Sequence, residues 1–283
     1  MTEQMTAPAD ARPPGEDAPF YAPVGREVEI LEAAWKQGLP VMLKGPTGSG
    51  KTRLVEHCAH RFGVPLFTVS CHEDMTASDL LGRYVLMGGD TEWVDGPLTR
   101  AVREGGICYL DEIVEARQDA TVAIHSLADH RRELNLERLG GLTLRAADGF
   151  LLVVSYNPGY QSVLKDLKMS TRQRMVAIEL DFPPPEVERQ VLMVEAGIDE
   201  SVADDLVRLG QGIRRHRESG LREAASTRTL IAAAKLMREG LSFMEAVTAG
   251  IAGPLTDDLE LREGLIAMME SYAPGGDGSG SAR

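Results

Sequence analysis

Short apolar runs alternate with helical repeats of apolar residues through the first two thirds of the chain. Five runs, each too short for a helix, predict buried strands at residues 39–44, 65–69, 107–110, 150–154 and 176–180. Between most of them, apolar residues recur at the spacing of a helix face. Strands separated by helices form βαβ units, so we predict an α/β fold with a parallel five-stranded sheet and helices on both faces.

Two stretches interrupt this rhythm and predict β-hairpins. Residues 82–95 carry the sequence Gly-Gly-Asp in the middle, which is typical of a tight turn. Residues 133–145 alternate apolar and polar positions around a second Gly-Gly pair. The residues alone favour ordinary surface hairpins at both places.

After three consecutive prolines, at residues 183–185, the pattern becomes helical throughout. Apolar spacing predicts helices near residues 186–196, 200–216, 227–239, 242–252 and 257–269. Because a proline run is a stiff break, we place a domain boundary there. The predicted parts are a flexible N-terminal arm, an α/β core with two hairpin insertions, a small all-helical lid domain and a flexible tail, over residues 1–19, 20–183, 184–272 and 273–283.

The turn after the first predicted strand carries the most specific motif of the chain. It fits the phosphate-loop pattern G-x-x-x-x-G-K-[ST] with Gly45, Pro46, Thr47, Gly48, Ser49, Gly50, Lys51 and Thr52. The strand before it and the helix after it direct backbone N–H groups and a positive helix end at one point, where a polyphosphate binds. Lys51 would contact the β- and γ-phosphates and Thr52 would ligate Mg²⁺, so we predict ATP and Mg²⁺ as cofactors.

A second group of polar residues follows the predicted strand at 107–110. Asp111, at the end of this strand, can hold Mg²⁺ directly or through water. Glu112 can polarise the water that attacks the γ-phosphate. An apolar strand that ends in two acids is a weak signal alone, but its place sixty residues after Lys51 favours ATP hydrolysis.

Three further polar side chains complete the candidate site. Asn157 follows the next strand and could orient the attacking water, although Asn-Pro-Gly is also a common turn sequence. Arg172 and Arg174 precede the last strand and could neutralise transition-state charge in a neighbouring subunit. Taken without a neighbour, these two residues belong to a basic loop.

The composition argues against several classes of function. The formal net charge of −13 repels phosphate backbones and anionic lipids, which disfavours nucleic-acid and membrane binding. Three cysteines without paired spacing predict neither a disulfide framework nor a zinc site. No segment approaches a membrane span, and the N-terminus has no apolar signal region. We therefore expect a cytoplasmic protein without a nucleic-acid partner or membrane insertion.

The order of these features resembles that of an AAA+ ATPase. A phosphate loop, an Asp-Glu strand, an asparagine after the following strand, arginines before the fifth strand and a helical lid occur in this order over about residues 23–272. The resemblance implies that Arg228, in the segment Ala-Ser-Thr-Arg-Thr-Leu, contacts the γ-phosphate from the lid as the second sensor. It also implies that the two hairpins are the helix-2 insert and the pre-sensor hairpin of the MoxR-type branch.

Three longer segments are similar to the CbbQ/NorQ subgroup of that branch, and most like its CbbQ members: residues 110–119, 155–162 and 167–174. Val114 and Glu115 replace an Asn-Arg pair that is usual in MoxR proteins, so no role of that arginine is carried over. Met175 stands where the family commonly has Phe after its finger arginine. Alignment to this position favours Arg174 over Arg172 as the principal finger.

This resemblance implies a molecular chaperone that works as a homo-hexameric ring and hydrolyses ATP between its subunits. It also implies an adaptor protein with a von Willebrand factor A domain, of the CbbO/NorD type. CbbQ-type members reactivate inhibited Rubisco, and NorQ-type members mature nitric oxide reductase. Both types share the motifs quoted above. We favour Rubisco as the remodelling target and keep nitric oxide reductase as the alternative.

Two other classes of function stay open. A nucleic-acid motor could have the same core, although the acidity of the chain argues against it. A nucleotide-binding scaffold is the other class, and intact Glu112 and Asn157 together with the paired arginines argue against it. On the first predicted hairpin, Trp93 is a candidate for gripping the adaptor or the target.

Overall fold

A computed structural model describes residues 18–157, 167–215 and 224–273 of the chain. Its contacts group the residues into two compact units, one extending to Leu180 and the other beginning at Asp181, with Phe20–Val24 and Thr47–Gly50 counted with the second. The predicted boundary, between residues 183 and 184, lies three residues later. Most of the predicted arm and tail fall outside the described residues.

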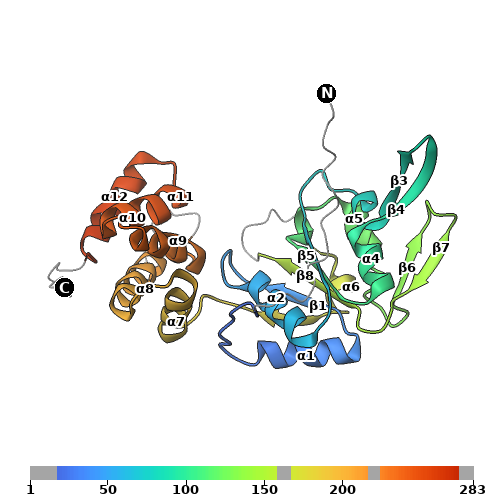
Figure 1. The fold of residues 1–283 in the computed structure, drawn as a ribbon, viewed down its shortest axis with the longest axis horizontal. Helices are drawn as coiled ribbons and strands as arrows, with labels where there is room; N and C mark the ends of the chain where they lie inside the picture. Colours follow the sequence, from blue (N-terminus) through green and yellow to red (C-terminus); the bar gives the residue numbers. More distant parts are fainter. Residues whose placement is uncertain (1–17, 158–166, 216–223, 274–283) are drawn as a thin grey trace. The chain divides into compact units, whose positions relative to one another are not determined.

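The first unit is built on a five-stranded parallel sheet with the strand order β2-β5-β8-β1-β9 (Figure 1). Its strands are β1 (Val41–Lys44), β2 (Leu66–Ser70), β5 (Ile107–Asp111), β8 (Leu151–Tyr156) and β9 (Val176–Glu179). All five strands occur where the apolar runs predicted them. The predicted fold class is therefore confirmed.

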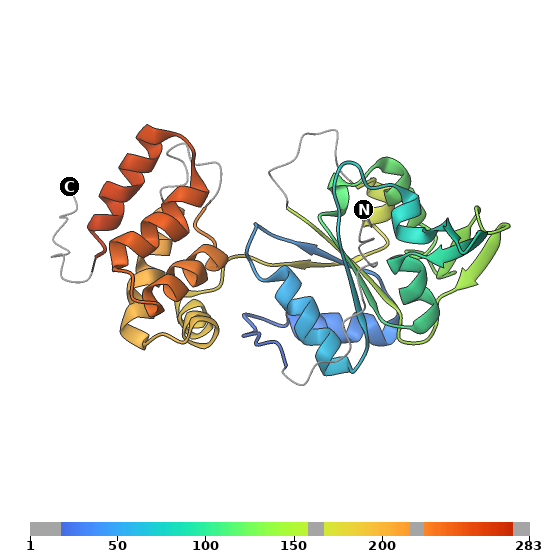
Figure 2. The same cartoon turned by 45° about the horizontal axis from the view of Figure 1, so that its top comes forward.

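Alternate residues of each strand point to opposite faces of this sheet, and both faces are covered by helices. Cys108 and Leu110 of β5 pack in one apolar cluster with α3 (Ala77–Leu81), α4 (Pro97–Glu104) and α5 (Gln118–Ala123). Two helices near the N-terminus cover the other face, α1 (Glu27–Gln37) and α2 (Lys51–Phe62), which are blue in Figure 2. Tyr109, between Cys108 and Leu110 along β5, therefore points toward α2 and the phosphate loop.

Both predicted hairpins are present as separate two-stranded sheets. The first joins β3 (Gly82–Met87) to β4 (Asp90–Asp95), and the second joins β6 (Glu133–Leu136) to β7 (Leu142–Arg145). Gly88 and Gly89 form the two-residue turn of the first hairpin with φ angles of 63° and 99°. Positive φ at both positions gives the turn the twist that paired strands need, which explains the Gly-Gly pair.

The second unit is helical. Its elements are α7 (Pro185–Ala196), α8 (Glu200–Arg215), α9 (Thr227–Arg238), α10 (Phe243–Val247), the π-helical segment η3 (Thr248–Ala252), α11 (Gly253–Leu255) and α12 (Leu259–Glu270). The single helix predicted at residues 242–252 is instead divided between α10 and η3. Pro254 has no N–H to donate to the carbonyl of Gly250, so the regular hydrogen-bond ladder cannot continue through this point.

A buried ion pair joins three helices of this unit. Glu188 on α7 is fully buried and accepts hydrogen bonds of 2.7 and 2.6 Å from the guanidinium of Arg214 on α8. The hydroxyl of Thr227, the first residue of α9, donates to the same carboxylate at 2.6 Å. The start of α9, where Arg228 lies, is thereby held against the other two helices. No helix in the described part of the chain has the length and hydropathy to cross a membrane.

Candidate active site

The carboxyl ends of neighbouring strands bring the predicted site residues to one edge of the sheet. The phosphate loop follows β1, Asp111 ends β5 and is followed by Glu112, and Asn157 follows β8. Asn157 connects two of these groups, because its Oδ1 accepts a 2.7 Å hydrogen bond from Lys51 Nζ and its Nδ2 donates to Glu112 Oε1 at 2.9 Å. Residues far apart in the sequence therefore meet in one hydrogen-bonded chain.

The phosphate loop has the backbone and side chains that a polyphosphate requires. Gly45, Gly48 and Gly50 have φ angles of 154°, 75° and 91°, which a residue with a side chain rarely adopts. The Ser49 hydroxyl is buried and makes no hydrogen bond within the described residues. Lys51, only 7% exposed, donates to the carbonyl oxygens of Gly45 at 2.8 Å and Pro46 at 2.9 Å. A buried cation and an unsatisfied hydroxyl fit an anionic ligand.

Oxygen atoms suited to Mg²⁺ lie beside this loop. Thr52 Oγ1 is 3.5 Å from the Tyr109 hydroxyl, which donates to Asp111 Oδ1 at 2.7 Å. Hydroxyl and carboxylate oxygens are what this ion prefers, and it usually takes one or two protein ligands together with substrate phosphates. The described residues contain no cluster of three or more acidic, histidine or cysteine side chains fit for a metal. Thr52 and Asp111 fit such a shared site.

Glu112 is held in a strained backbone conformation. Its φ and ψ angles of 55° and 45° lie in the left-handed region, which costs a residue other than glycine about 1–3 kcal/mol. The Ser155 hydroxyl accepts a 3.0 Å hydrogen bond from the Glu112 N–H, and Asn157 holds the carboxylate. Both the backbone and the side chain of Glu112 are therefore held by hydrogen bonds. An unfavourable backbone conformation that is fixed in this way is typical of a residue that must face a substrate.

The two arginines before β9 have different surroundings. Arg172 lies on α6 (Met169–Arg172) and is half-buried, with its guanidinium 5.8 Å from the ring centre of Tyr156. Arg174, two residues later, is exposed. The segment that carries both arginines is anchored just before Arg172 by the buried Thr171, whose hydroxyl is 2.9 Å from His125 Nε2. The two arginines thus differ in exposure, and the sequence alone had favoured Arg174 over Arg172 only by alignment.

Arg228 lies on α9 of the helical unit and is exposed. The N-terminus of this helix is capped by Ser226, whose hydroxyl accepts a hydrogen bond from the Thr229 N–H. The role of Arg228 as a second sensor stays a prediction. Met175 is partly buried against the apolar cluster of the α/β unit, as suits an apolar side chain at this position. Residues 158–162 of the asparagine segment lie outside the described residues.

Two residues of this site escaped the analysis of the sequence. Tyr109 and Ser155 both contact Asp111, and neither was assigned a role from the sequence. A signal for Tyr109 existed, because residues two apart on a strand share a face, and Tyr109 is two residues before Asp111. Ser155 occupies the end of the neighbouring strand β8, and only the pairing of β5 with β8 places it beside Asp111.

Burial also sets the protonation of nearby groups. Burial raises the pKa of the Cys71 thiol to about 12, and the carboxylates of Asp111 and Glu112 contribute to the rise. Burial likewise raises the pKa of Tyr109, with a further contribution from Asp111. Both groups therefore stay neutral at physiological pH, and Cys71 is a poor nucleophile beside the site.

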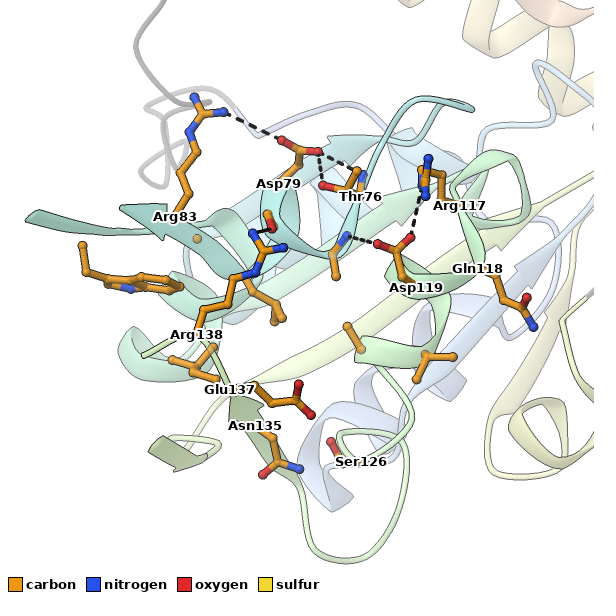
Figure 3. Close-up of a pocket in the computed structure, with 18 residues that line it drawn as sticks. Thr76, Asp79, Arg83, Arg117, Gln118, Asp119, Ser126, Asn135, Glu137 and Arg138 are labelled. Atoms are coloured by element: carbon orange, nitrogen blue, oxygen red, sulfur yellow. Dashed lines mark hydrogen bonds and ion pairs between the residues drawn. The ribbon is translucent and has the colours of Figure 1, made fainter. Parts of the chain in front are cut away.

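A concave region lies away from this edge, between the two hairpins (Figure 3). Its volume is about 1060 Å³, and its walls come from α3, β3, β4, α5 and β6. Trp93 forms part of the wall and packs edge-on against Tyr84 with ring centres 5.3 Å apart. Charged side chains surround this hairpin pocket, and several of them pair with each other, as Arg117 does with Asp119.

Comparisons with known proteins agree with this geometry. Residues 40–175 match the family model described as AAA domain (dynein-related subfamily), and residues 188–272 match that described as CbbQ/NirQ/NorQ C-terminal. The chain is 58% identical to the denitrification regulatory protein NirQ of Pseudomonas aeruginosa, over 85% of this chain and 92% of that protein. It is 56% identical to protein NorQ of Paracoccus denitrificans (88% and 92% covered) and 49% identical to protein CbbQ of Hydrogenophilus thermoluteolus (89% and 94% covered).

Proposed function

Because the chain belongs to the CbbQ/NirQ/NorQ family of MoxR-type AAA+ ATPases, we propose that it is the ATP-hydrolysing subunit of a ring-shaped motor that remodels a metabolic enzyme. The observation that carries this proposal is the chain of hydrogen bonds from Lys51 through Asn157 to Glu112. It joins the phosphate-binding cation to the candidate base, so that the γ-phosphate can be sensed and attacked at one place.

Each group of this site has a defined task in ATP hydrolysis. The loop from Gly45 to Thr52 and the ammonium of Lys51 bind the phosphates. Thr52 and Asp111 would hold Mg²⁺, and the bound ion would supply positive charge to the phosphate oxygens. Glu112 accepts the proton of the attacking water, and Asn157 orients both this carboxylate and the γ-phosphate.

Arg174 is the better candidate for a finger that completes the site of a neighbouring subunit. It is exposed, whereas Arg172 is half-buried over the ring of Tyr156 in its own subunit. The anchored turn at Thr171 gives Arg174 a fixed base from which to extend. Within a homo-hexamer, hydrolysis would then depend on contact between subunits, with Arg228 acting from the lid.

The decisive experiment is Glu112→Gln. This variant keeps the shape of the side chain and removes the base, so we expect ATP binding and ring formation to persist while hydrolysis falls by about 10²–10⁴-fold. Nucleotide affinity, native mass and phosphate release are the measurements. Glu115→Gln, three residues away on η1 (Ile113–Glu115), is the matched control and should hydrolyse ATP at the normal rate.

Other outcomes would favour other classes of function. Full remodelling by Glu112→Gln would show that ATP turnover is incidental and would favour a nucleotide-binding scaffold. Stimulation of the ATPase by DNA or RNA would favour a nucleic-acid motor. The net charge of −13 leads us to expect no such stimulation.

The target enzyme has two candidates, Rubisco and nitric oxide reductase. The motifs alone led us to favour Rubisco. Against this preference, the identities to NirQ and NorQ are 58% and 56%, whereas the identity to CbbQ is 49%. This difference favours the denitrification candidate, so we test nitric oxide reductase and Rubisco side by side.

The two candidates predict different products in a reconstituted assay. The chain, ATP and a von Willebrand factor A-domain adaptor are mixed with Rubisco carrying an inhibitory sugar phosphate, and its release is followed. In parallel, the chain and adaptor are co-expressed with nitric oxide reductase, and its activity is compared with that obtained beside the Glu112→Gln variant. A positive result in one arm alone identifies the target, and failure in both arms contradicts the remodelling role.

The hairpin pocket is the surface that we assign to the adaptor or the target. Trp93 was already a candidate for this role from the sequence, and its neighbours on the hairpin support the proposal. Trp93 and Tyr84 belong to one face of the first hairpin, together with Leu86, which is 74% exposed. Exposed apolar side chains beside a cavity of this size are typical of a binding surface for another protein.

A further inference from the structure

Tyr109 places a phenol inside the catalytic edge of the sheet. The residue lies in the middle of β5 and is fully buried. Its hydroxyl donates to Asp111 Oδ1 at 2.7 Å and is 3.5 Å from Thr52 Oγ1. A phenylalanine would fill nearly the same volume without a polar group to satisfy, so packing alone does not explain the hydroxyl.

Ser155 approaches the same oxygen of Asp111 from the neighbouring strand. Its hydroxyl donates a short hydrogen bond to Asp111 Oδ1 and accepts the N–H of Glu112 at 3.0 Å. Two donors from two strands therefore fix one oxygen of the Asp111 carboxylate. With Oδ1 engaged in this way, the orientation of the carboxylate is set before any ligand binds, and Oδ2 is the oxygen left to face a cation.

We propose that Tyr109 is a positioning residue for the divalent cation, which fixes Asp111 and Thr52 in the arrangement that the cation requires. This inference rests on the proposed function, which assigns these two residues to the cation. The phenol hydroxyl lies between the side chains of Asp111 and Thr52 and sets the distance between their oxygen atoms. Ser155 is its counterpart on the other side of the carboxylate. Preorganised oxygen ligands suit Mg²⁺ because this ion tolerates little departure from octahedral geometry.

The experiment measures the affinity for the cation as well as the rate of hydrolysis. A fluorescent, non-hydrolysable ATP analogue is bound to the full chain in EDTA and then during a Mg²⁺ titration. For Tyr109→Phe we expect the affinity in EDTA to stay within about twofold, and the Mg²⁺ concentration at half effect to rise about tenfold, as for the loss of one hydrogen bond to a charged group. Raising Mg²⁺ should restore its ATP hydrolysis.

Three companion variants make the result decisive. Ser155→Ala removes the other donor and should shift the Mg²⁺ titration in the same direction, so the inference stays testable if Tyr109→Phe does not fold. Asp111→Asn should shift it further. Cys108→Ala, the adjacent buried residue of β5 that faces the opposite side of the sheet, should leave the titration unchanged.

Two outcomes would overturn the inference, and they can be distinguished. If Asp111→Asn shifts the titration while Tyr109→Phe and Ser155→Ala coincide with the unchanged protein, the hydroxyls are structural and the proposed cation site stands. A lower melting temperature of Tyr109→Phe with an unchanged titration has the same meaning. If Asp111→Asn has no effect either, the assignment of Asp111 to the cation is itself wrong.

Discussion

The sheet edge and the hairpin pocket belong to the same unit but are built in opposite ways. At the edge, Lys51 and Ser155 are buried, and polar side chains pair with each other, as Lys51 does with Asn157 and Ser155 with Asp111. Around the pocket, Tyr84 and Leu86 are exposed, and the charged side chains form surface pairs such as that of Arg83 with Asp79, at 4.0 Å.

This difference indicates that the sheet edge and the hairpin pocket are suited to different kinds of ligand. Buried polar groups that satisfy each other have fixed positions, which chemistry on a phosphate requires. Exposed apolar groups and solvated ion pairs cost little to rearrange, because a surface pair contributes only about 0–1 kcal/mol. The edge is therefore suited to a fixed ligand, and the pocket to a partner whose shape it must follow.

The helix α5 connects the hairpin pocket with the candidate finger residues. Gln118, Val122 and Ala123 of this helix line the hairpin pocket. His125, just after the helix, contacts Thr171 beside the candidate finger residues. A change at the pocket could thus reach the candidate finger residues through one short helix.

The largest effect is expected at the finger. We predict that Arg174→Ala lowers ATP hydrolysis by about 10³-fold, because it removes a positive charge from the transition state in the neighbouring subunit. ATP binding should change little. Arg172→Ala is the comparison and should cost less, since its guanidinium is held over Tyr156 of its own subunit.

Mixed rings sharpen this prediction. Subunits with Arg174→Ala lack the finger but keep their own site, and subunits with Glu112→Gln have the reverse defect. Mixing the two should restore part of the hydrolysis. At some interfaces, an intact Glu112 of one subunit then meets an intact Arg174 of its neighbour. Absence of any recovery would show that Arg174 acts within its own subunit.

A smaller effect is expected at the pocket. Trp93→Ala removes the aromatic wall and its contact with Tyr84, and we predict that remodelling of the target falls about tenfold, the loss typical of one aromatic interface residue. ATP affinity should be unchanged, because the pocket shares no side chain with the phosphate loop. Remodelling at the normal rate would remove the pocket from the mechanism.

The smallest effect concerns the pH dependence of folding stability and its origin in His125, just after α5. Burial, with contributions from Lys168 and Arg174, lowers the pKa of His125 below its ordinary value of 6.5. As pH falls through that value, the unfolded chain binds a proton before the folded chain does, so folding stability decreases. His125→Gln should lose less stability than the unchanged chain between pH 8 and pH 5.5, and melting temperatures at both pH values measure this. An equal loss in both proteins would contradict the lowered pKa.

Much of the fold could be predicted from the sequence, because its signals are local. The apolar runs predicted the five strands within a few residues, since a buried parallel strand needs a continuous apolar segment. The Gly-Gly pairs identified both hairpins, since the tight turn at Gly88 and Gly89 needs positive φ. The split of the helix at residues 242–252 was missed, because the signal there is a single proline near its end.

For the site, the sequence by itself determined which residue types are available and at which strand ends they stand. The phosphate loop and the Asp-Glu pair follow from contiguous motifs, which fix local backbone geometry. Tertiary structure alone decided that Asn157 bridges Lys51 and Glu112, that Ser155 and Tyr109 share one oxygen of Asp111, and that Arg174 is exposed where Arg172 is not. The physical reason is that strand order and register set these distances, and neighbouring strands in space, such as β1 and β8, lie more than a hundred residues apart in the chain.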